Sequence, residues 1–309
     1  MLFQQPLTRA HSVTVRAPGK VNLQLSIGPL RDDGYHHLAT VFQAVSLFDD
    51  LTVTRSDRLR VRTSGENAAE VPDGQDNLAG RAAALLAARI GVEPLVDISI
   101  RKRIPVGGGM AGGSADAAGA LVACAALWQA DLGDAELLAL AARLGSDVSF
   151  SLLGGMAIGE RRGEALTPLP VRSTQHWVFA LADTLLSTPR VFAELDRMRD
   201  DTVPEPVRSE ALLRALDGGD PVAIGRALTN EAQPAALALA PGMGATLAAG
   251  QTAGALGSIV SGTGATCAFL ARDEAHARQL AAALEASGTC RAARHAYGPV
   301  PGPAVIAVE

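Results

Sequence analysis

The chain begins with alternating apolar and polar residues, the pattern of a β-strand that buries one face. Apolar residues occupy most alternate positions of the segment 12–27, with a break at 17–19. A turn signal follows at 32–34, and further extended stretches cover 37–47 and 51–61. The first part of the chain is therefore predicted to be rich in β-structure.

Alanine and leucine recur at helical spacing further along the chain, and short apolar strands separate these stretches. The predicted helices are 77–90, 114–128, 134–144, 189–199, 209–216, 221–228 and 273–287. The predicted later strands are 95–100, 177–182, those flanking 261–266, and 290–296. Segregated strands and helices favour an α+β fold. The prolines and polar residues near position 170 suggest two lobes, 1–170 and 171–309.

Composition limits the kinds of partner this chain can have. With 309 residues and 48% hydrophobic residues it can fill two cores. A net charge of −5 argues against a nucleic acid or a polybasic contact with a membrane. The three cysteines are widely spaced, and we find neither a signal layout at the start nor a long apolar run. We therefore expect a cytoplasmic protein.

A glycine-rich segment lies between a predicted strand and a predicted helix. Five of the seven residues 107–113 are glycine. Glycine exposes backbone N–H groups to a ligand, and the N-terminus of a helix attracts anions. The segment thus favours phosphate binding, although the lysine-bearing P-loop pattern is absent.

Lysine is rare in this sequence, which uses arginine for almost every positive charge. Only two of the 27 basic residues are lysines, Lys20 and Lys102, and the rest are arginines. A compact ammonium differs from a planar guanidinium in the contacts it makes. The two lysines therefore mark candidate functional positions, with biased composition as the alternative explanation.

Three glycine-containing segments, 17–22, 105–118 and 261–266, resemble the GHMP kinase superfamily. Within that superfamily, Asp33-Gly34-Tyr35-His36 and the segments 40–43 and 145–148 are similar to members that act on a cytidylyl substrate. The resemblance implies a two-lobed fold. Its N-terminal lobe would be ribosomal-protein-S5-domain-2-like and would bind ATP, and its C-terminal lobe would be ferredoxin-like and would bind substrate.

The implied reaction transfers the γ-phosphate of ATP to the 2-hydroxyl of a cytidine-diphosphate-linked methylerythritol, a step of non-mevalonate isoprenoid synthesis. Mg²⁺ would bridge the phosphates of ATP, with Ser114 as a further possible ligand. The partner is thus a small molecule, and the protein would be a monomer or a homodimer.

The same resemblance assigns the nucleotide site. Its implied residues are Asn77, Lys102, Pro105, Val106, Gly107, Gly108, Gly109, Met110, Ala111, Gly112, Gly113 and Ser114. Ser114 would stand at the N-cap of the following helix. Ala111 and Ala115 depart from the family, which often has glycine and serine there.

Lys20 and Asp147 match the catalytic pair of the family. Lys20 would orient the attacking hydroxyl and Asp147 would accept its proton. Asn22 lies two positions after Lys20 on a predicted strand, so the two side chains share a face, and Asn22 is expected to contact substrate. A turn or N-cap role is the alternative for Asp147.

Cytidine recognition is implied for Tyr35 and His36, with Phe42 and Phe192 completing an aromatic wall around the base. A core role is the alternative for both phenylalanines. The second glycine turn would approach the substrate through Gly262, Thr263, Gly264 and Thr266, unless it is a plain hairpin. Arg161 faces either the acceptor or solvent.

Two other functions compete with this interpretation. Homoserine or mevalonate kinases share the fold, but they need no cytosine reader such as Tyr35 and His36. A nucleotide-binding regulatory module without catalysis would not need both Lys20 and Asp147. The residues therefore favour a kinase with a cytidylyl acceptor.

Overall fold

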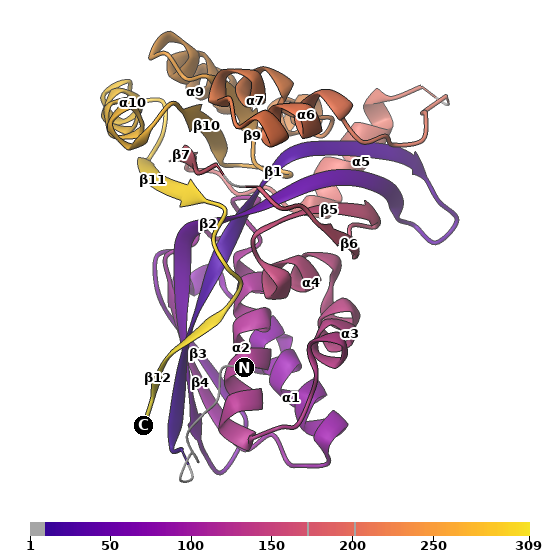
Figure 1. Cartoon of the computed structure of the whole chain (residues 1–309), viewed down its shortest axis with the longest axis vertical. Coiled ribbons are helices and arrows are strands. Elements are labelled where there is room, and N and C mark those ends of the chain that lie inside the picture. Colours follow the sequence, from indigo (N-terminus) through magenta and orange to yellow (C-terminus); the bar gives the residue numbers. More distant parts are fainter. Residues whose placement is uncertain (1–9, 172, 201) are drawn as a thin grey trace.

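The computed structural model describes residues 10–171, 173–200 and 202–309. Most of the opening segment, where we expect no targeting signal, lies outside these ranges. Figure 1 shows a lower lobe formed by the first part of the chain and an upper lobe formed by the later part. Within the described ranges, no helix combines the length and apolar character that crossing a membrane requires.

An eight-stranded sheet forms the frame of the lower lobe. The strands β12-β1-β2-β4-β3 lie in this order, β5 pairs with both β2 and β6, and β8 pairs with β1. The bounds are β1 (Ser12–Leu30), β2 (His36–Arg55), β3 (Arg60–Gly65), β4 (Val96–Lys102), β5 (Met156–Arg161), β6 (Ala165–Pro168), β8 (Thr229–Asn230) and β12 (Ala304–Val308).

The first two strands form a long antiparallel hairpin that reaches the upper lobe (Figure 1). The break expected at 17–19 is a shift of register after Pro18, and β1 continues through it. Proline cannot donate a backbone hydrogen bond, so a bulge is well accommodated at this point. The stretches expected at 37–47 and 51–61 are joined in part, because β2 runs unbroken from His36 to Arg55. Tyr35 and His36 lie where the hairpin turns into β2.

Four helices cover one face of this sheet (Figure 1). They are α1 (Leu78–Ile90), α2 (Gly112–Trp128), α3 (Asp134–Leu144) and α4 (Ser146–Leu153), and short 3₁₀ turns lie at Ala68–Glu70 and Gly74–Asp76. Helix α2 packs against α1 and β1, and its many alanines permit this close packing. Asn77 caps α1, since its side chain accepts a hydrogen bond from the backbone of Ala79 at 2.9 Å.

A four-stranded sheet with the order β11-β7-β10-β9 forms the upper lobe. Its strands are β7 (Gln175–Leu181), β9 (Gly257–Val260), β10 (Cys267–Ala271) and β11 (Ala292–Gly298). Its helices are α5 (Thr188–Met198), α6 (Glu210–Gly218), α7 (Pro221–Ala227), α8 (Gln233–Leu239), α9 (Gly242–Thr252) and α10 (Glu274–Ala286). Counted in chain order, the strands lie 4-1-3-2, which is the ferredoxin-like arrangement.

Buried polar contacts join the two sheets. Gln43 on β2 accepts a hydrogen bond from the Trp177 indole at 2.7 Å and donates to Gln175 at 2.5 Å. The predicted lobe boundary near residue 170 falls between β6 and β7, and it stays a prediction. Both β8 and β12 lie beyond that boundary in the chain but pair with β1 of the lower sheet.

The predicted α+β class is confirmed, and most predicted elements lie within a few residues of their observed positions. The sequence analysis missed α4, β5, β6, β8, α8, α9 and β12. The strands among them are short, and α8 and α9 are rich in alanine and glycine, so neither a period of two nor an amphipathic helical period marks them. These elements are defined by what they pack against.

Candidate active site

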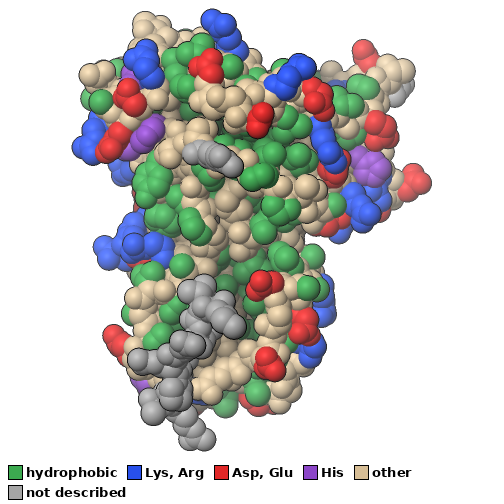
Figure 2. All heavy atoms as spheres, viewed as in Figure 1, with side chains coloured by type: hydrophobic (Ala, Val, Ile, Leu, Met, Phe, Trp, Pro, Cys, Tyr) green, Lys and Arg blue, Asp and Glu red, His purple; other side chains and the backbone are tan. Residues whose placement is uncertain are grey.

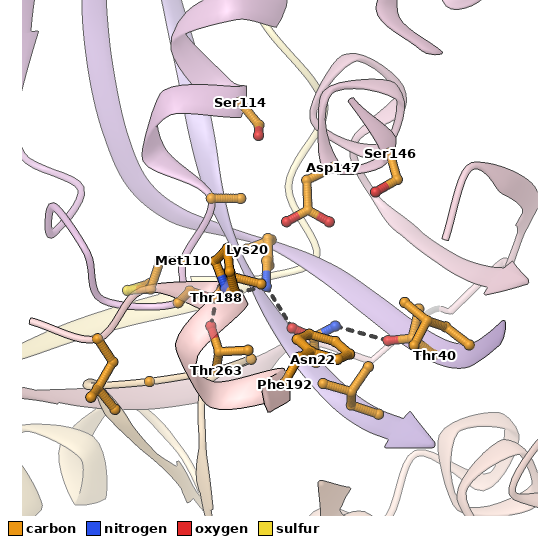
Figure 3. A pocket seen from close by; sticks show the side chains of 18 of the residues that line it. Lys20, Asn22, Thr40, Met110, Ser114, Ser146, Asp147, Thr188, Phe192 and Thr263 are labelled. Atoms are coloured by element: carbon orange, nitrogen blue, oxygen red, sulfur yellow. Dashed lines mark hydrogen bonds between the residues drawn. The ribbon is translucent and has the colours of Figure 1, made fainter. Parts of the chain in front are cut away.

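A cavity of about 770 Å³ gathers most of the predicted site residues from both lobes. The β1–β2 hairpin, the two glycine segments, the start of α4 and the start of α5 line it (Figure 3). The predicted residues that it contains are Lys20, Asn22, Tyr35, His36, Phe42, Pro105, Gly107, Gly108, Gly109, Met110, Ala111, Gly112, Gly113, Ser114, Asp147, Phe192, Gly262, Thr263 and Gly264.

Lys20 is buried in the wall of this cavity and held by neutral oxygen atoms. Its ammonium donates to Asn22 Oδ1 at 2.6 Å and to the carbonyl of Gly109 at 2.8 Å. Asn22 in turn donates to the Thr40 hydroxyl at 2.8 Å (Figure 3). The expected shared face of Lys20 and Asn22 is thereby confirmed. Burial lowers the pKa of Lys20, and the charge of Asp147 opposes that shift.

Asp147 lies in the first turn of α4, which starts at Ser146. The N-terminal end of a helix carries a partial positive charge, so it is a favourable place for a carboxylate. Figure 3 shows the carboxylate of Asp147 directed toward the ammonium of Lys20. An ammonium has three N–H donors, and two of those on Lys20 are used by Asn22 and Gly109. A group bound between Lys20 and Asp147 would therefore meet one donor and one proton acceptor.

The first glycine segment turns sharply before entering α2. Gly107 and Gly109 have φ values of 64° and 71°, and Ala111 also has a positive φ of 56°. Ala111 is the N-cap residue, so the prediction that Ser114 caps the helix is wrong. The helix starts two residues earlier because the backbone reverses at Ala111. Ser114 lies within the first turn, and its hydroxyl points toward the space in front of Asp147 (Figure 3).

The two glycine segments touch each other across the lobes. A Cβ atom on Gly109 would lie 1.9 Å from the carbonyl oxygen of Ser261, so only glycine fits at this position. The Ser261 hydroxyl also donates to the Gly109 carbonyl at 3.2 Å. Asn230 holds the second segment from behind by donating to the carbonyls of Val260 and Gly262 at 2.8 and 2.7 Å. The backbone of both segments is thus fixed where it borders the cavity.

Aromatic residues surround the end of the cavity near the hairpin tip, each with its own neighbour. His36 lies 5.0 Å from the Phe192 ring, and Phe42 stacks on Phe150 at 4.7 Å. Tyr35 is 55% exposed. Phe42 thus has the core contact considered as its alternative role, while it still lines the cavity.

Arg162 extends over the Tyr35 ring at 4.7 Å from its centroid, a cation–π contact. Arg162 lines the cavity, whereas the neighbouring Arg161, which has a positive φ of 63°, does not, although both side chains are exposed. The cation that lines this end of the cavity is therefore Arg162 and not Arg161.

Four predicted site residues lie outside the lining of this cavity. Lys102 is buried and donates to Asp49 at 2.5 Å and to Asp116 at 2.7 Å, so the structure places it beneath the glycine segment in a closed ion cluster. Asn77 is occupied in capping α1. Val106 and Thr266 border a separate small hollow. ATP contact by Asn77, Lys102 and Val106 and substrate contact by Thr266 stay predictions from resemblance.

The cavity also contains polar residues that the sequence analysis did not select: Thr40, Ser146, Arg162, Thr188 and Asp196. Thr188 contacts the predicted Thr263 through their hydroxyls at 3.0 Å (Figure 3). Asp196 follows Phe192 by four residues, which places both on one face of a helix. That spacing was available in the sequence as a signal for Asp196.

Comparison with known families shows which proteins this chain is similar to. The chain matches the model of the GHMP kinases N terminal domain over residues 77–155 and that of the GHMP kinases C terminal domain over residues 210–290. A 4-diphosphocytidyl-2-C-methyl-D-erythritol kinase of Thermobifida fusca (strain YX) is 57% identical over 303 residues, covering 96% of this chain and 98% of that relative.

Solved structures agree with this relationship. The crystal structure of a 4-(cytidine 5'-diphospho)-2C-methyl-D-erythritol kinase superposes with a TM-score of 0.75 at 35% identity, covering 92% of this chain and 98% of that one. A homoserine kinase from Cytophaga hutchinsonii gives the same TM-score at 20% identity, with coverage of 99% and 100%, and this likeness shows the fold alone. The chain therefore belongs to the GHMP kinases and, within them, to the family of 4-diphosphocytidyl-2-C-methyl-D-erythritol kinases.

Proposed function

We propose that this protein transfers the γ-phosphoryl group of ATP to the 2-hydroxyl of 4-diphosphocytidyl-2-C-methyl-D-erythritol, a step in non-mevalonate isoprenoid precursor synthesis. The observation that carries the proposal is the placement of Lys20 and Asp147 face to face in a cavity bordered by two glycine segments. Relatives with this activity in their names align over nearly the whole chain. At the other end of the cavity, the rings of His36 and Phe192 lie side by side, where they could contact a base.

The proposed step is an in-line displacement at phosphorus. The 2-hydroxyl oxygen forms a bond to the γ-phosphorus while the bond from that phosphorus to the β–γ bridging oxygen breaks, and ADP leaves with the electron pair. Asp147 takes the hydroxyl proton, and the free N–H of Lys20 stabilises negative charge as it develops. Because Lys20 is held by Asn22 and Gly109, it needs little reorganisation during this step.

The triphosphate is assigned to the segment 107–114 and the start of α2. Its glycines leave backbone N–H groups accessible, and the helix terminus favours anions. The Ser114 hydroxyl in the first turn is an oxygen donor of the kind that Mg²⁺ accepts beside phosphate oxygens. Mg²⁺ bound by ATP and Ser114 would offset phosphate charge, while Lys20 and Asp147 act on the acceptor.

A panel of acceptors tests the proposal. Release of ADP is measured with 4-diphosphocytidyl-2-C-methyl-D-erythritol, homoserine and mevalonate as separate acceptors, and phosphorus NMR locates the new phosphate. We expect turnover with the cytidylyl acceptor alone. Turnover with homoserine or mevalonate in its place would overturn the proposal. A chain that binds ATP and transfers to none of them would instead be the regulatory module.

Asp147→Asn is the matched variant for this assay, since it keeps the shape of the side chain and removes its charge. We expect its turnover to fall about 10²–10⁴-fold, with ATP affinity nearly unchanged. Normal turnover of the variant would remove Asp147 from the mechanism.

A further inference from the structure

Two side chains of helix α5 hold His36 at the cavity wall. Its Nε2 atom lies 2.9 Å from Asp196 Oδ1, and its ring lies 5.0 Å from that of Phe192 with the planes 38° apart. Phe192 and Asp196 are four residues apart on α5 and both line the cavity. The imidazole is largely buried by these contacts, although it comes from the hairpin of the other lobe.

The contact with Asp196 determines what the other ring nitrogen can do. An ionised carboxylate accepts hydrogen bonds and donates none, so Nε2 of His36 must carry a proton. In a neutral imidazole the remaining nitrogen, Nδ1, is then an acceptor. Among the described residues, Nδ1 has no hydrogen-bond partner. When its ring is neutral, His36 therefore presents an unused acceptor in a wall of the cavity.

We infer that Asp196 is a positioning residue that makes the site select cytosine over uracil. It fixes His36 in the tautomer with a proton on Nε2, and Nδ1 then accepts a hydrogen bond from the 4-amino group of the base. Uracil carries an oxygen acceptor at that position, which would face Nδ1 without a proton between them. The inference rests on the proposed function, because it assigns the base of the acceptor to this end of the cavity.

The surroundings of His36 oppose the other ring orientation. Turning the ring over would separate Nε2 from Asp196 and would require it to move past Phe192. The adjacent His37 has a different environment, since its Nδ1 lies 3.2 Å from the exposed Glu205. Neighbouring residues of a strand point to opposite sides, so His37 does not substitute for His36.

The test compares Asp196→Asn with a matched control on the same helix. An amide can accept from Nε2 or donate to it, so both tautomers of His36 become accessible in this variant. The control is Glu194→Gln, which also converts a carboxylate to an amide, at a residue paired with Arg197 and outside the cavity. The kcat/KM values are measured with the cytidylyl acceptor and with its uridylyl analogue.

We expect Asp196→Asn to lower the preference for cytosine about tenfold, mainly through KM of the acceptor, while KM for ATP stays the same. Glu194→Gln should have the same kcat/KM values as the parent protein with the cytidylyl acceptor and with its uridylyl analogue. An unchanged preference in Asp196→Asn would overturn the inference. A parent protein that uses both acceptors equally would also overturn it, and the proposed phosphoryl transfer would still stand.

Nitrogen NMR of histidine-labelled protein tests the tautomer without activity. The chain has six histidines, and the His36→Gln variant identifies the signal that belongs to His36. We expect Nδ1 of His36 to be unprotonated in the parent protein and to become partly protonated in Asp196→Asn. A proton on Nδ1 in the parent protein would overturn the inference even if the cytidylyl acceptor were turned over. Failure of every acceptor would overturn the proposed function, and the tautomer would still be decided.

Discussion

The two lysines of this chain are almost equally buried, yet their pKa values move in opposite directions. Lys20 is 5% exposed and Lys102 is 3% exposed. Burial lowers the pKa of Lys20, and the charge of Asp147 offsets only part of that effect. Burial alone would lower the pKa of Lys102 as well, but contact with Asp116 and Asp49 raises this pKa above the usual value. The charge of the nearest partners, and not the depth of burial, decides the direction.

The same difference separates the ammonium that we propose acts in catalysis from one that is enclosed in an ion cluster. Lys20 contacts neutral oxygens and borders a cavity, so its charge remains available to an incoming phosphoryl group. Lys102 is enclosed by two carboxylates, and Asp49 also accepts hydrogen bonds from the backbone of Arg103 and Ile104 at 2.6 and 2.9 Å. This ion cluster ties β4, the end of β2 and helix α2 together. Lys102 thus stabilises the base of the glycine segment.

Loss of Lys102 should have the largest effect on stability. Lys102→Met leaves the buried carboxyl groups of Asp49 and Asp116 without their ammonium partner, and we expect the free energy of unfolding to fall by about 3–5 kcal/mol. Urea unfolding followed by circular dichroism measures this change. Lys20→Met is the matched comparison, and we expect it to cost far less stability because no carboxylate contacts Lys20 directly. Equal losses in the two variants would remove the distinction drawn here.

Loss of Lys20 should act on turnover instead. We expect Lys20→Met to lower kcat about 10²–10³-fold, as removal of a donor to developing charge does in other enzymes. Steady-state kinetics with the cytidylyl acceptor measure it. Folded Lys102→Met, assayed at low temperature, should keep a kcat much closer to that of the parent protein. A larger kcat loss in Lys102→Met would make Lys102 the functional lysine.

The lowered pKa of Lys20 predicts an early loss of activity at alkaline pH. The protonated form is the active one, so kcat/KM should fall as pH rises through a pKa below the 10.5 of an ordinary lysine. A pH profile of kcat/KM from pH 6 to about 10.5 measures it. The Asp116→Asn variant is the control, because Asp116 contacts Lys102 and not Lys20. If kcat/KM fell only at a pKa at or above the 10.5 of an ordinary lysine, burial would not control the titration of Lys20.

The smallest predicted effect concerns Asp116, whose pKa is raised to about 8 by burial and by the neighbouring charge of Asp49. The folded state keeps this proton up to about pH 8, whereas the unfolded chain releases it near 3.8. Stability of the parent protein is therefore lost between these values as pH rises. Asp116→Asn cannot titrate, so its stability relative to the parent should improve by at least about 1 kcal/mol between pH 5 and 8. If the free energies of unfolding of the two proteins changed with pH in the same way, this expectation would be contradicted.

Local patterns in the sequence revealed the parts of the site that follow from local geometry. Alternation placed Lys20 beside Asn22, and the glycines of 107–113 indicated a turn before a helix. The scarcity of lysine drew attention to both ammonium groups. It could not distinguish them, since Asp49 and Asp116 approach Lys102 only in the folded chain.

The contacts at the end of the cavity that we propose for the base depend on tertiary packing, so local sequence patterns do not reveal them. Asp196 and His36 are 160 residues apart, and the hairpin tip meets α5 only because the two sheets pack together. Whether Arg161 faces the acceptor or solvent was likewise undecidable from sequence. It depends on the positive φ at Arg161, which sends successive side chains in different directions.

Both ends of the described chain lie in the lower sheet, because the final strand pairs with the first. Val308 on β12 pairs with Val13 on β1, and the backbone of His11 donates to Glu309 at 2.6 Å. The segment from β7 to β11 is thus an insertion that is covalently joined to the lower sheet after β6 and before β12, and its two-residue strand β8 returns to pair with β1 (Figure 1). Charged side chains of both signs are mixed over the visible face of this insertion (Figure 2). Such a double tether prevents free rotation of the insertion about a single covalent link.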